Sequence, residues 1–309
     1  MAERSISIRV PGTSANCGPG FDTLGLACTL YNDLTLELTH EPQLEIVVHG
    51  EGAGAIPTDA RNIVWRSIQY LLQQAGAERE YRGAKIEMEN RVPISRGLGS
   101  SATAIVAGLK AANVLIGNRY SRRELLQFAA AIEGHPDNVA PAIFGGFTIS
   151  TTMRSGVECF SFVPKFHLTF VVAVPDFSLP TRAARKVLPE DVPMKDAVFN
   201  IGRATMLIAA LTRGSERFLR ASFDDALHQP YRSKLVPGMY DVFRAARRAG
   251  AVGTSLSGAG PSLIAYALER HRCEEAIGEA MKSAFAAHDV HADILTLRLD
   301  MRGAHVRKE

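Results

Sequence analysis

A glycine-rich loop between an alternating strand and an apolar helix is the feature that most constrains the fold of this chain. The segment 85–89, Lys-Ile-Glu-Met-Glu, alternates polar and apolar residues and predicts a strand. Residues 102–116 are apolar on nearly every side, which predicts a buried helix ending at Gly117. The loop 93–101, Pro-Ile-Ser-Arg-Gly-Leu-Gly-Ser-Ser, joins the two. The order along the chain is therefore strand, glycine loop, buried helix.

This loop has the properties of an anion site. The start of a helix presents unpaired backbone N–H groups, and the helix dipole adds partial positive charge at the same end. The hydroxyls of Ser100 and Ser101 add donors for phosphate oxygens or a ligand for Mg²⁺. Glycine and serine also form plain helix N-caps, so this segment alone leaves both interpretations open.

The common nucleotide motifs are absent. No Gly-Lys-Ser/Thr ends the loop, and the dinucleotide spacing of three glycines does not occur. Neither Asp-Phe-Gly nor His-Arg-Asp of the protein kinases is present. If the loop binds a nucleotide, the chain belongs to another class of kinase.

The remaining pattern predicts an α+β fold in two domains, residues 1–155 and 156–309. Turn formers predict a loop at 11–20 whose backbone can approach a ligand closely, and a second loop at 257–261; the prolines of 175–193 indicate a mobile lid or an inter-element loop. Further strands are predicted at 5–10, 34–38, 44–48, 168–174, 263–267 and 293–299, and further helices at 62–74, 124–132, 197–212, 238–249 and 273–287.

Charge and cysteine usage exclude several classes of protein. The 35 basic and 32 acidic residues nearly balance, so no nucleic-acid partner is expected. No apolar run is long enough to span a bilayer, and Glu3, Arg4 and Arg9 leave no core for a secretory signal. We expect a cytoplasmic protein. Its cysteines lack the spacing of a disulfide framework or zinc site; they are Cys17, Cys28, Cys159 and Cys273.

Three separated segments, 11–26, 93–102 and 253–262, resemble the three signature motifs of the GHMP kinases in order and spacing. This superfamily is named for galactokinase, homoserine kinase, mevalonate kinase and phosphomevalonate kinase. The segment 133–146, Glu-Gly-His-Pro-Asp-Asn-Val-Ala-Pro-Ala-Ile-Phe-Gly-Gly, resembles the homoserine kinase version. The resemblance implies an N-terminal domain like ribosomal protein S5 domain 2, a ferredoxin-like C-terminal domain, and an active site between them.

The reaction implied by the resemblance is phosphorylation of L-homoserine by ATP, giving ADP and O-phospho-L-homoserine in threonine biosynthesis. Residues implied to bind ATP are Asn62 and Val64 near the adenine, and Pro93, Arg96, Gly97, Leu98, Gly99, Ser100 and Ser101 around the phosphates. Ser101 and Glu133 would hold Mg²⁺. Residues implied to bind homoserine are Asn16, Asp22, His135, Asn138, Arg185, Arg232 and Gly258. A homodimer is expected.

These assignments are chemically coherent. Homoserine carries a carboxylate, an ammonium and a primary hydroxyl, so its site needs a cation and an anionic acceptor. Arg185 or Arg232 can supply the first and Asp22 the second, while Asn16 or Asn138 orients the hydroxyl. Phosphoryl transfer depends chiefly on positioning and charge neutralisation, so no strong general base is required. The residues expected to act in catalysis are Asn16, Asn138 and Ser101.

Each residue taken alone also has an ordinary structural explanation. Asp22 suits an Asx-turn, His135 a loop, Glu133 a helix end, and the two arginines a solvated surface. Cys17 and Thr103 depart from the family pattern without removing a polar contact. Two rival functions remain at this point: another GHMP-family small-molecule kinase, and a non-catalytic nucleotide-binding regulator that has kept the fold.

Overall fold

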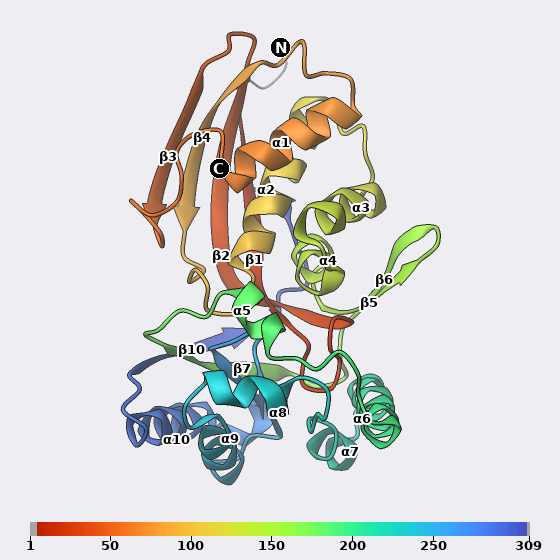
Figure 1. Cartoon of the computed structure of the whole chain (residues 1–309), viewed down its shortest axis with the longest axis vertical. Helices are drawn as coiled ribbons and strands as arrows, with labels where there is room; N and C mark the ends of the chain where they lie inside the picture. Colours follow the sequence, from red (N-terminus) through yellow and green to blue (C-terminus); the bar gives the residue numbers. More distant parts are fainter. Residues whose placement is uncertain (1–4, 308–309) are drawn as a thin grey trace.

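The computed structural model describes residues 5–307, which form two β-sheets with helices packed on them (Figure 1). The larger sheet runs in the order β11-β1-β2-β4-β3, and β5 pairs with both β2 and β6. Its pairs are antiparallel except for the parallel pair of β3 and β4. The strands are β1 Ser5–Ala15, β2 Leu24–Thr39, β3 Leu44–Gly50, β4 Gly83–Asn90, β5 Phe147–Met153, β6 Gly156–Phe162 and β11 His305–Val306.

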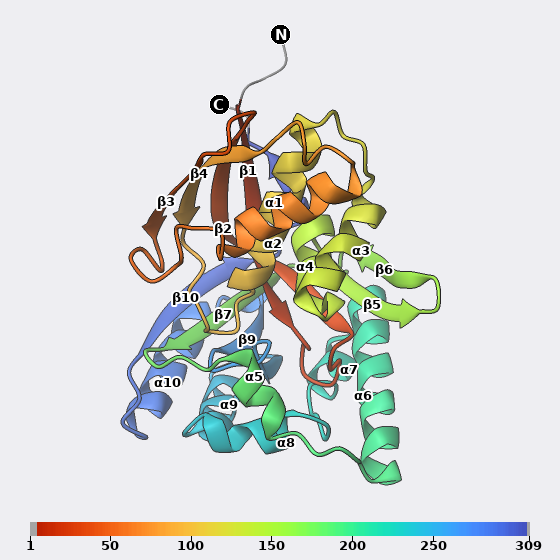
Figure 2. The ribbon, with the colours of Figure 1, turned by 45° about the horizontal axis from the view of Figure 1, so that its top comes forward.

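Four helices cover one face of this sheet, as Figures 1 and 2 show. They are α1 Ile63–Gln74, α2 Ser100–Leu115, α3 Arg122–Glu133 and α4 Pro136–Phe144. The predicted buried helix is confirmed as α2, which begins two residues earlier than expected. Its apolar side chains, such as Ile105 and Leu109, join Ile8, Leu36 and Ile86 of the sheet in one core. Burial on all sides explains why its sequence is apolar throughout.

The smaller sheet is antiparallel and runs in the order β10-β7-β9-β8. Its elements are β7 Leu168–Pro175, β8 Gly253–Leu256, β9 Leu263–Leu268 and β10 Ala292–Arg298, with α9 Met239–Arg248 and α10 Glu274–Ala286 on one face. Along the chain these elements follow a β-α-β-β-α-β order, which confirms the ferredoxin-like prediction.

The other face of the smaller sheet packs against the first half of the chain. Phe170 and Tyr266 share a buried cluster with Leu26 and Phe147. Strands β7 and β9 are therefore buried on both faces, which explains their continuous apolar sequences. The shared cluster fixes the two halves against each other and so sets the width of the space between them.

The remaining α-helices lie along the chain between β7 and α9. They are α5 Thr181–Lys186, α6 Met194–Arg213, α7 Glu216–Arg220 and α8 Gln229–Arg232, with 3₁₀ turns at Ser233–Leu235 and Glu269–His271. The proline-rich segment predicted as a lid or connection contains α5. The Leu179 N–H donates to the Ser95 carbonyl at 3.1 Å, which holds this segment against the glycine loop.

The predicted loop at 11–20 is wrong in its first half. Strand β1 continues to Ala15, pairing Thr13, Ser14 and Ala15 with β2 after an irregularity between Pro11 and Thr13. The turn formers there are small residues at a bulged strand end, where both strand pairing and close packing are possible. Only the residues that follow leave the sheet.

The domain division at 155/156 stays a prediction. The hairpin of β5 and β6 runs across it, and β11 returns to the larger sheet. Glu3 and Arg4, used above against a secretory signal, lie outside the described residues. Among residues 5–307 no helix combines the length and apolar character needed to cross a membrane.

Candidate active site

A cleft between the two sheets brings most of the predicted site residues together. Its volume is about 330 Å³, at the lower end of the roughly 300–1,000 Å³ typical of small-molecule sites. The predicted residues that line it are Asn16, Asp22, Pro93, Arg96, Gly97, Gly99, Ser100, Ser101, Glu133, His135, Asn138, Arg185, Arg232 and Gly258.

The glycine loop delivers the start of α2 to this cleft. Gly99 is the N-cap residue with φ of 73°, and it contributes no capping side chain. The first helical hydrogen bond of this end is from the Thr103 N–H to the Gly99 carbonyl, at 2.9 Å. The preceding amides of Ser100 and Ser101 therefore stand at a helix N-terminus that carries no acidic side chain in its first turn. Backbone amides and dipole together favour an anion here.

Residues 257–260 form a floor under the loop. A side chain on Gly97 would place its Cβ 2.2 Å from the Ser257 carbonyl oxygen, so only glycine fits this approach. The Ser257 hydroxyl lies 2.7 Å from the Gly97 carbonyl, and the Ser262 N–H donates to the Arg96 carbonyl at 3.3 Å. Residues from the last third of the chain thus hold the loop in place.

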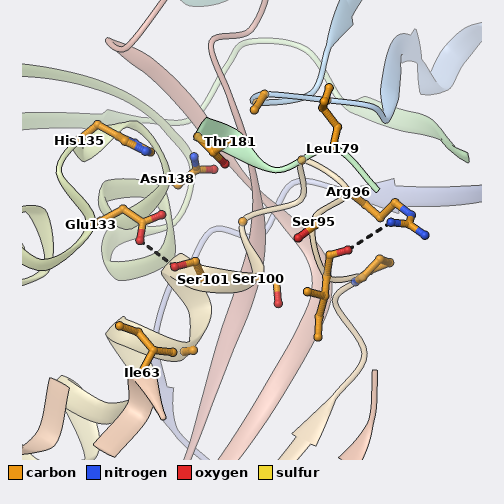
Figure 3. Close-up of a pocket in the computed structure, with 18 of the residues that line it drawn as sticks. Ile63, Ser95, Arg96, Ser100, Ser101, Glu133, His135, Asn138, Leu179 and Thr181 are labelled. Atoms are coloured by element: carbon orange, nitrogen blue, oxygen red, sulfur yellow. Dashed lines mark hydrogen bonds between the residues drawn. The ribbon is translucent and has the colours of Figure 1, made fainter. Parts of the chain in front are cut away.

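Glu133 and Ser101 meet at the mouth of this loop (Figure 3). The Ser101 hydroxyl donates to Glu133 Oε2 at 2.8 Å, joining the start of α2 to the end of α3. Burial raises the pKa of the Glu133 carboxyl, against the lowering effects of Ser101 and His135. A carboxylate and a hydroxyl are the kind of oxygen ligands that Mg²⁺ prefers. The residues present therefore fit this ion.

The start of α4 supplies a second group of polar side chains. His135 is the N-cap of α4, and its Nδ1 lies 2.5 Å from an Asp137 carboxylate oxygen. Burial alone would lower the pKa of His135, but the hydrogen bond and charge of Asp137 outweigh it and raise that pKa. Asn138 accepts a 2.8 Å hydrogen bond from the Thr13 hydroxyl. Figure 3 shows His135, Asn138 and Glu133 on the same side of the cleft.

An ion pair also lines the cleft. Arg185 donates two hydrogen bonds to the Asp22 carboxylate, at 3.0 and 2.8 Å. The Asn16 amide links this ion pair to the floor, because it donates to the Gly258 carbonyl at 2.8 Å and accepts from the Asp22 N–H at 3.0 Å. Asn16 and Asp22 both have positive φ, which turns the chain sharply after β1. The pairing raises the pKa of Arg185.

Arg232 is a buried cation beside this ion pair. Its side chain is among the largest fully buried ones, and burial together with the charge of Arg185 lowers its pKa to about 10. Within residues 5–307 its hydrogen bonds go to the Ala184 and Gly258 carbonyls and the His228 ring, each at 3.2 Å, and none goes to a carboxylate. A buried charge without a counterion is costly, so an anionic ligand would stabilise it.

Three predicted residues are not in the cleft wall. Asn62, Val64 and Leu98 are buried in the protein interior. Asn62 caps α1, its side chain accepting from the Val64 N–H at 2.9 Å. The cleft residues near them include the apolar side chains of Ile56, Ile63 and Met88. The adenine contacts of Asn62 and Val64 stay predictions.

Asp137, Ser95 and Thr181 also line the cleft, although none of them was singled out from the sequence. Asp137 had a usable signal, because it stands in the first turn of α4 two residues after His135. The other two had none: Ser95 is a single residue with φ of 54° in the loop, and Thr181 reaches the cleft only through the placement of α5.

Comparison with known proteins places this geometry among kinases. The chain matches the family models described as GHMP kinases N terminal domain, over residues 62–146, and GHMP kinases C terminal, over residues 206–287. A homoserine kinase of Carboxydothermus hydrogenoformans is 43% identical, covering 97% of this chain and 96% of the relative. One of Moorella thermoacetica is 44% identical, covering 97% and 99%.

A crystal structure described as homoserine kinase from Cytophaga hutchinsonii superposes on this chain with a TM-score of 0.90. The two chains are 33% identical, and the match covers 99% of this chain and 98% of the other. The similarity therefore extends over both sheets and the cleft between them.

Proposed function

Because this chain belongs to the homoserine kinases, a branch of the GHMP kinase family, we infer that its cleft transfers the γ-phosphoryl group of ATP to L-homoserine. The products are ADP and O-phospho-L-homoserine, and the step belongs to threonine biosynthesis. One observation carries this inference: a helix N-terminus suited to phosphate shares a cleft with an unpaired buried cation and a paired carboxylate. The helix N-terminus suits a nucleotide phosphate, and the cation and the carboxylate suit the two charges of an amino acid.

ATP would bind with its phosphates on the glycine loop. The amides at Ser100 and Ser101 can donate to phosphate oxygens, and Arg96 of the same loop also lines the cleft. The apolar wall of Ile56, Ile63 and Met88 offers a surface for the adenine. Because transfer requires precise alignment, the floor contact at Gly97 serves to keep the loop rigid.

Homoserine would bind in the part of the cleft lined by Asp22, Arg185 and Arg232. Its carboxylate suits Arg232 and Arg185, and its ammonium suits the Asp22 carboxylate. Asn138 and Asn16 are the amides that can orient the hydroxyl, and both are themselves held by hydrogen bonds. The reaction then depends on positioning and charge neutralisation rather than on a dedicated base.

Mg²⁺ is proposed at Glu133 and Ser101. When bound, the ion neutralises charge on the transferring phosphate. The protein contributes the carboxylate of Glu133 and orients it with the Ser101 hydroxyl. A homodimer remains a proposal, which light scattering of the purified protein would test.

The activity is tested with purified protein, Mg²⁺, ATP and a panel of alcohols that includes L-homoserine, mevalonate and ethanolamine. ADP release should require L-homoserine and match the phosphohomoserine formed. Turnover of mevalonate in preference to homoserine would indicate another kinase of the superfamily. ATP binding without ADP release for any acceptor would indicate a regulator.

Removing either arginine should weaken use of the amino acid. Arg185→Ala and Arg232→Ala are each expected to lower kcat/KM for homoserine by about 10- to 150-fold, the equivalent of roughly 1.5–3 kcal/mol for a charge-assisted contact. The loss should fall mainly on the homoserine KM, since neither side chain lies at the phosphate loop. Steady-state kinetics with varied homoserine measure it.

The chain offers a matched control for each arginine. Arg182 is exposed on the same short helix as Arg185, and Lys234 is exposed two residues after Arg232. Alanine at either control position should leave kcat/KM within about twofold, as for an isolated surface charge. Normal kcat/KM in both Arg185→Ala and Arg232→Ala would remove the proposed amino-acid site.

A further inference from the structure

His228 is a fully buried histidine directly behind the cleft. Its Nε2 lies 2.8 Å from the Gly18 carbonyl oxygen, and its Nδ1 lies 3.2 Å from Arg232 Nη1. The ring also stacks on Phe21, with centroids 5.2 Å apart and an angle of 25° between the planes. His228 was not predicted as a site residue, and it does not line the cleft, but it contacts Arg232, which does.

The partners of the two ring nitrogens fix the protonation state. A guanidinium can only donate, so Nδ1 must accept; a carbonyl can only accept, so Nε2 must carry the hydrogen. His228 is therefore the neutral Nε2–H tautomer. An imidazolium would present a second donor to Arg232 and lose that contact.

Arg232 has one part of its guanidinium left for a ligand. Its Nε donates to Ala184, and its Nη1 faces both Gly258 and the His228 ring. Within residues 5–307 its Nη2 makes no hydrogen bond. Because Arg232 lines the cleft, Nη2 is the nitrogen that remains for a ligand.

The Phe21 ring also contacts the Arg232 guanidinium and helps to orient it. The guanidinium of Arg232 lies 5.3 Å from the centre of the Phe21 ring, and that of Arg185 lies 5.8 Å from it. The aromatic ring thus contacts both cations, while His228 stacks on the same ring and receives a hydrogen bond from Arg232. His228 is the residue that joins Gly18, Phe21 and Arg232.

We propose that His228 is a positioning residue for the amino-acid substrate: its Nδ1 holds Arg232 so that Nη2 meets the homoserine carboxylate. This proposal rests on the proposed function, because it assigns Arg232 to that carboxylate. The proposal adds one requirement to the residues that line the cleft. A neutral His228, protonated on Nε2, must accept a hydrogen bond from Arg232 at Nδ1.

The charged surroundings of His228 agree with a neutral ring. The groups facing it are Asp225, whose carboxylate lies 3.6 Å from Nε2, Arg232, and the more distant Asp22. The Asp225 carboxylate accepts backbone N–H bonds from Leu227, His228 and Gln229, which occupies its oxygens. Burial, the largest effect, and the Arg232 charge keep the pKa of His228 below its usual value.

Two substitutions separate the two hydrogen bonds of the ring. The amide oxygen of His228→Asn can take the place of Nδ1 as acceptor for Arg232. The asparagine side chain is too short to donate to the Gly18 carbonyl as well. The longer His228→Gln can place its amide near Nε2 and donate to Gly18, but leaves Arg232 without the acceptor. Both lose the stacking on Phe21, so that loss cancels in the comparison.

The expected result is a difference in the homoserine KM. His228→Gln should raise it about tenfold over wild type, as for loss of one hydrogen bond to a charged group, and His228→Asn should raise it clearly less. The KM for ATP should stay within about twofold in both, because the phosphate loop is untouched. Equal homoserine KM values in the two variants, or a parallel change in the ATP KM, would overturn the proposal.

A second measurement needs no variant to fold. In ¹⁵N-resolved NMR of the wild-type protein, one histidine should show an exchange-protected Nε2–H with an unprotonated, hydrogen-bonded Nδ1. Absence of any such buried ring would contradict the assignment. Failure of the proposed function would look different, since wild-type protein would then not use homoserine at all.

Discussion

Gly97→Ala is expected to lower kcat/KM for ATP by more than about 100-fold, since a shift of about 1 Å in a catalytic group can cost that much. The new Cβ would lie 2.2 Å from the Ser257 carbonyl oxygen, which is a backbone atom and cannot rotate away. The loop or the floor must therefore move, and the amides at the start of α2 move with the loop. Calorimetry with an ATP analogue and steady-state kinetics measure the effect.

Gly117→Ala is the matched control. Gly117 also has a positive φ, of 89°, but its Cβ would meet no atom within 4 Å, and it follows the opposite end of α2. This variant should lose about 1–2 kcal/mol of stability from backbone strain and keep its affinity for ATP. Similar losses of ATP binding in the two variants would show that strain, not the contact with Ser257, is responsible.

Glu133→Gln should lower kcat on the order of 100-fold, comparable to removal of a group that stabilises transition-state charge. The substitution keeps the size of the side chain and removes the negative charge proposed to hold Mg²⁺. More Mg²⁺ should then be needed for half-maximal rate, and calorimetric titration of the ATP complex with Mg²⁺ gives a readout independent of turnover. Ser101→Ala, which keeps the carboxylate, should have the smaller effect.

Because the pKa of Glu133 is raised, the Mg²⁺ requirement of the enzyme should depend on pH. Protons and Mg²⁺ compete for the carboxylate, and a raised pKa means that protonation begins at a higher pH than for an exposed glutamate. The Mg²⁺ concentration for half-maximal rate should therefore rise as the pH falls. In Glu133→Gln this dependence should be weaker. An identical pH dependence in both proteins would exclude Glu133 as the group that titrates.

The sequence was most informative where one physical requirement determines many residues. The apolar run that became α2 and the continuous strand β7 could be predicted because burial on all sides permits little else. The glycine loop predicted a helix N-terminus with unpaired amides, which is found at the start of α2; that it binds an anion stays a prediction. The pairing of Ser101 with Glu133 joins two helices, and it was accessible only through the family resemblance.

What the sequence could not reveal depends on contacts between distant segments. The extension of β1 to Ala15 follows from its pairing with β2, which overrides the local preference of turn formers. His228 has no local signal, because its role arises from Gly18, Phe21 and Arg232 meeting around one ring. Ser95 and Thr181 likewise reach the cleft through the fold of their segments.

The ion pair of Asp22 and Arg185 has a consequence for ligand choice. In the free protein each charge already has its counterion, and the pair also offsets the repulsion between Arg185 and Arg232. If an amino acid binds here as proposed, it can exchange partners with both groups at once, its ammonium replacing the guanidinium and its carboxylate replacing the aspartate. A hydroxy acid carries only the carboxylate and would leave Asp22 without a counterion. An amino alcohol carries only the ammonium and would leave Arg185 without one. We therefore expect the cleft to select zwitterionic ligands at the binding step, before phosphoryl transfer.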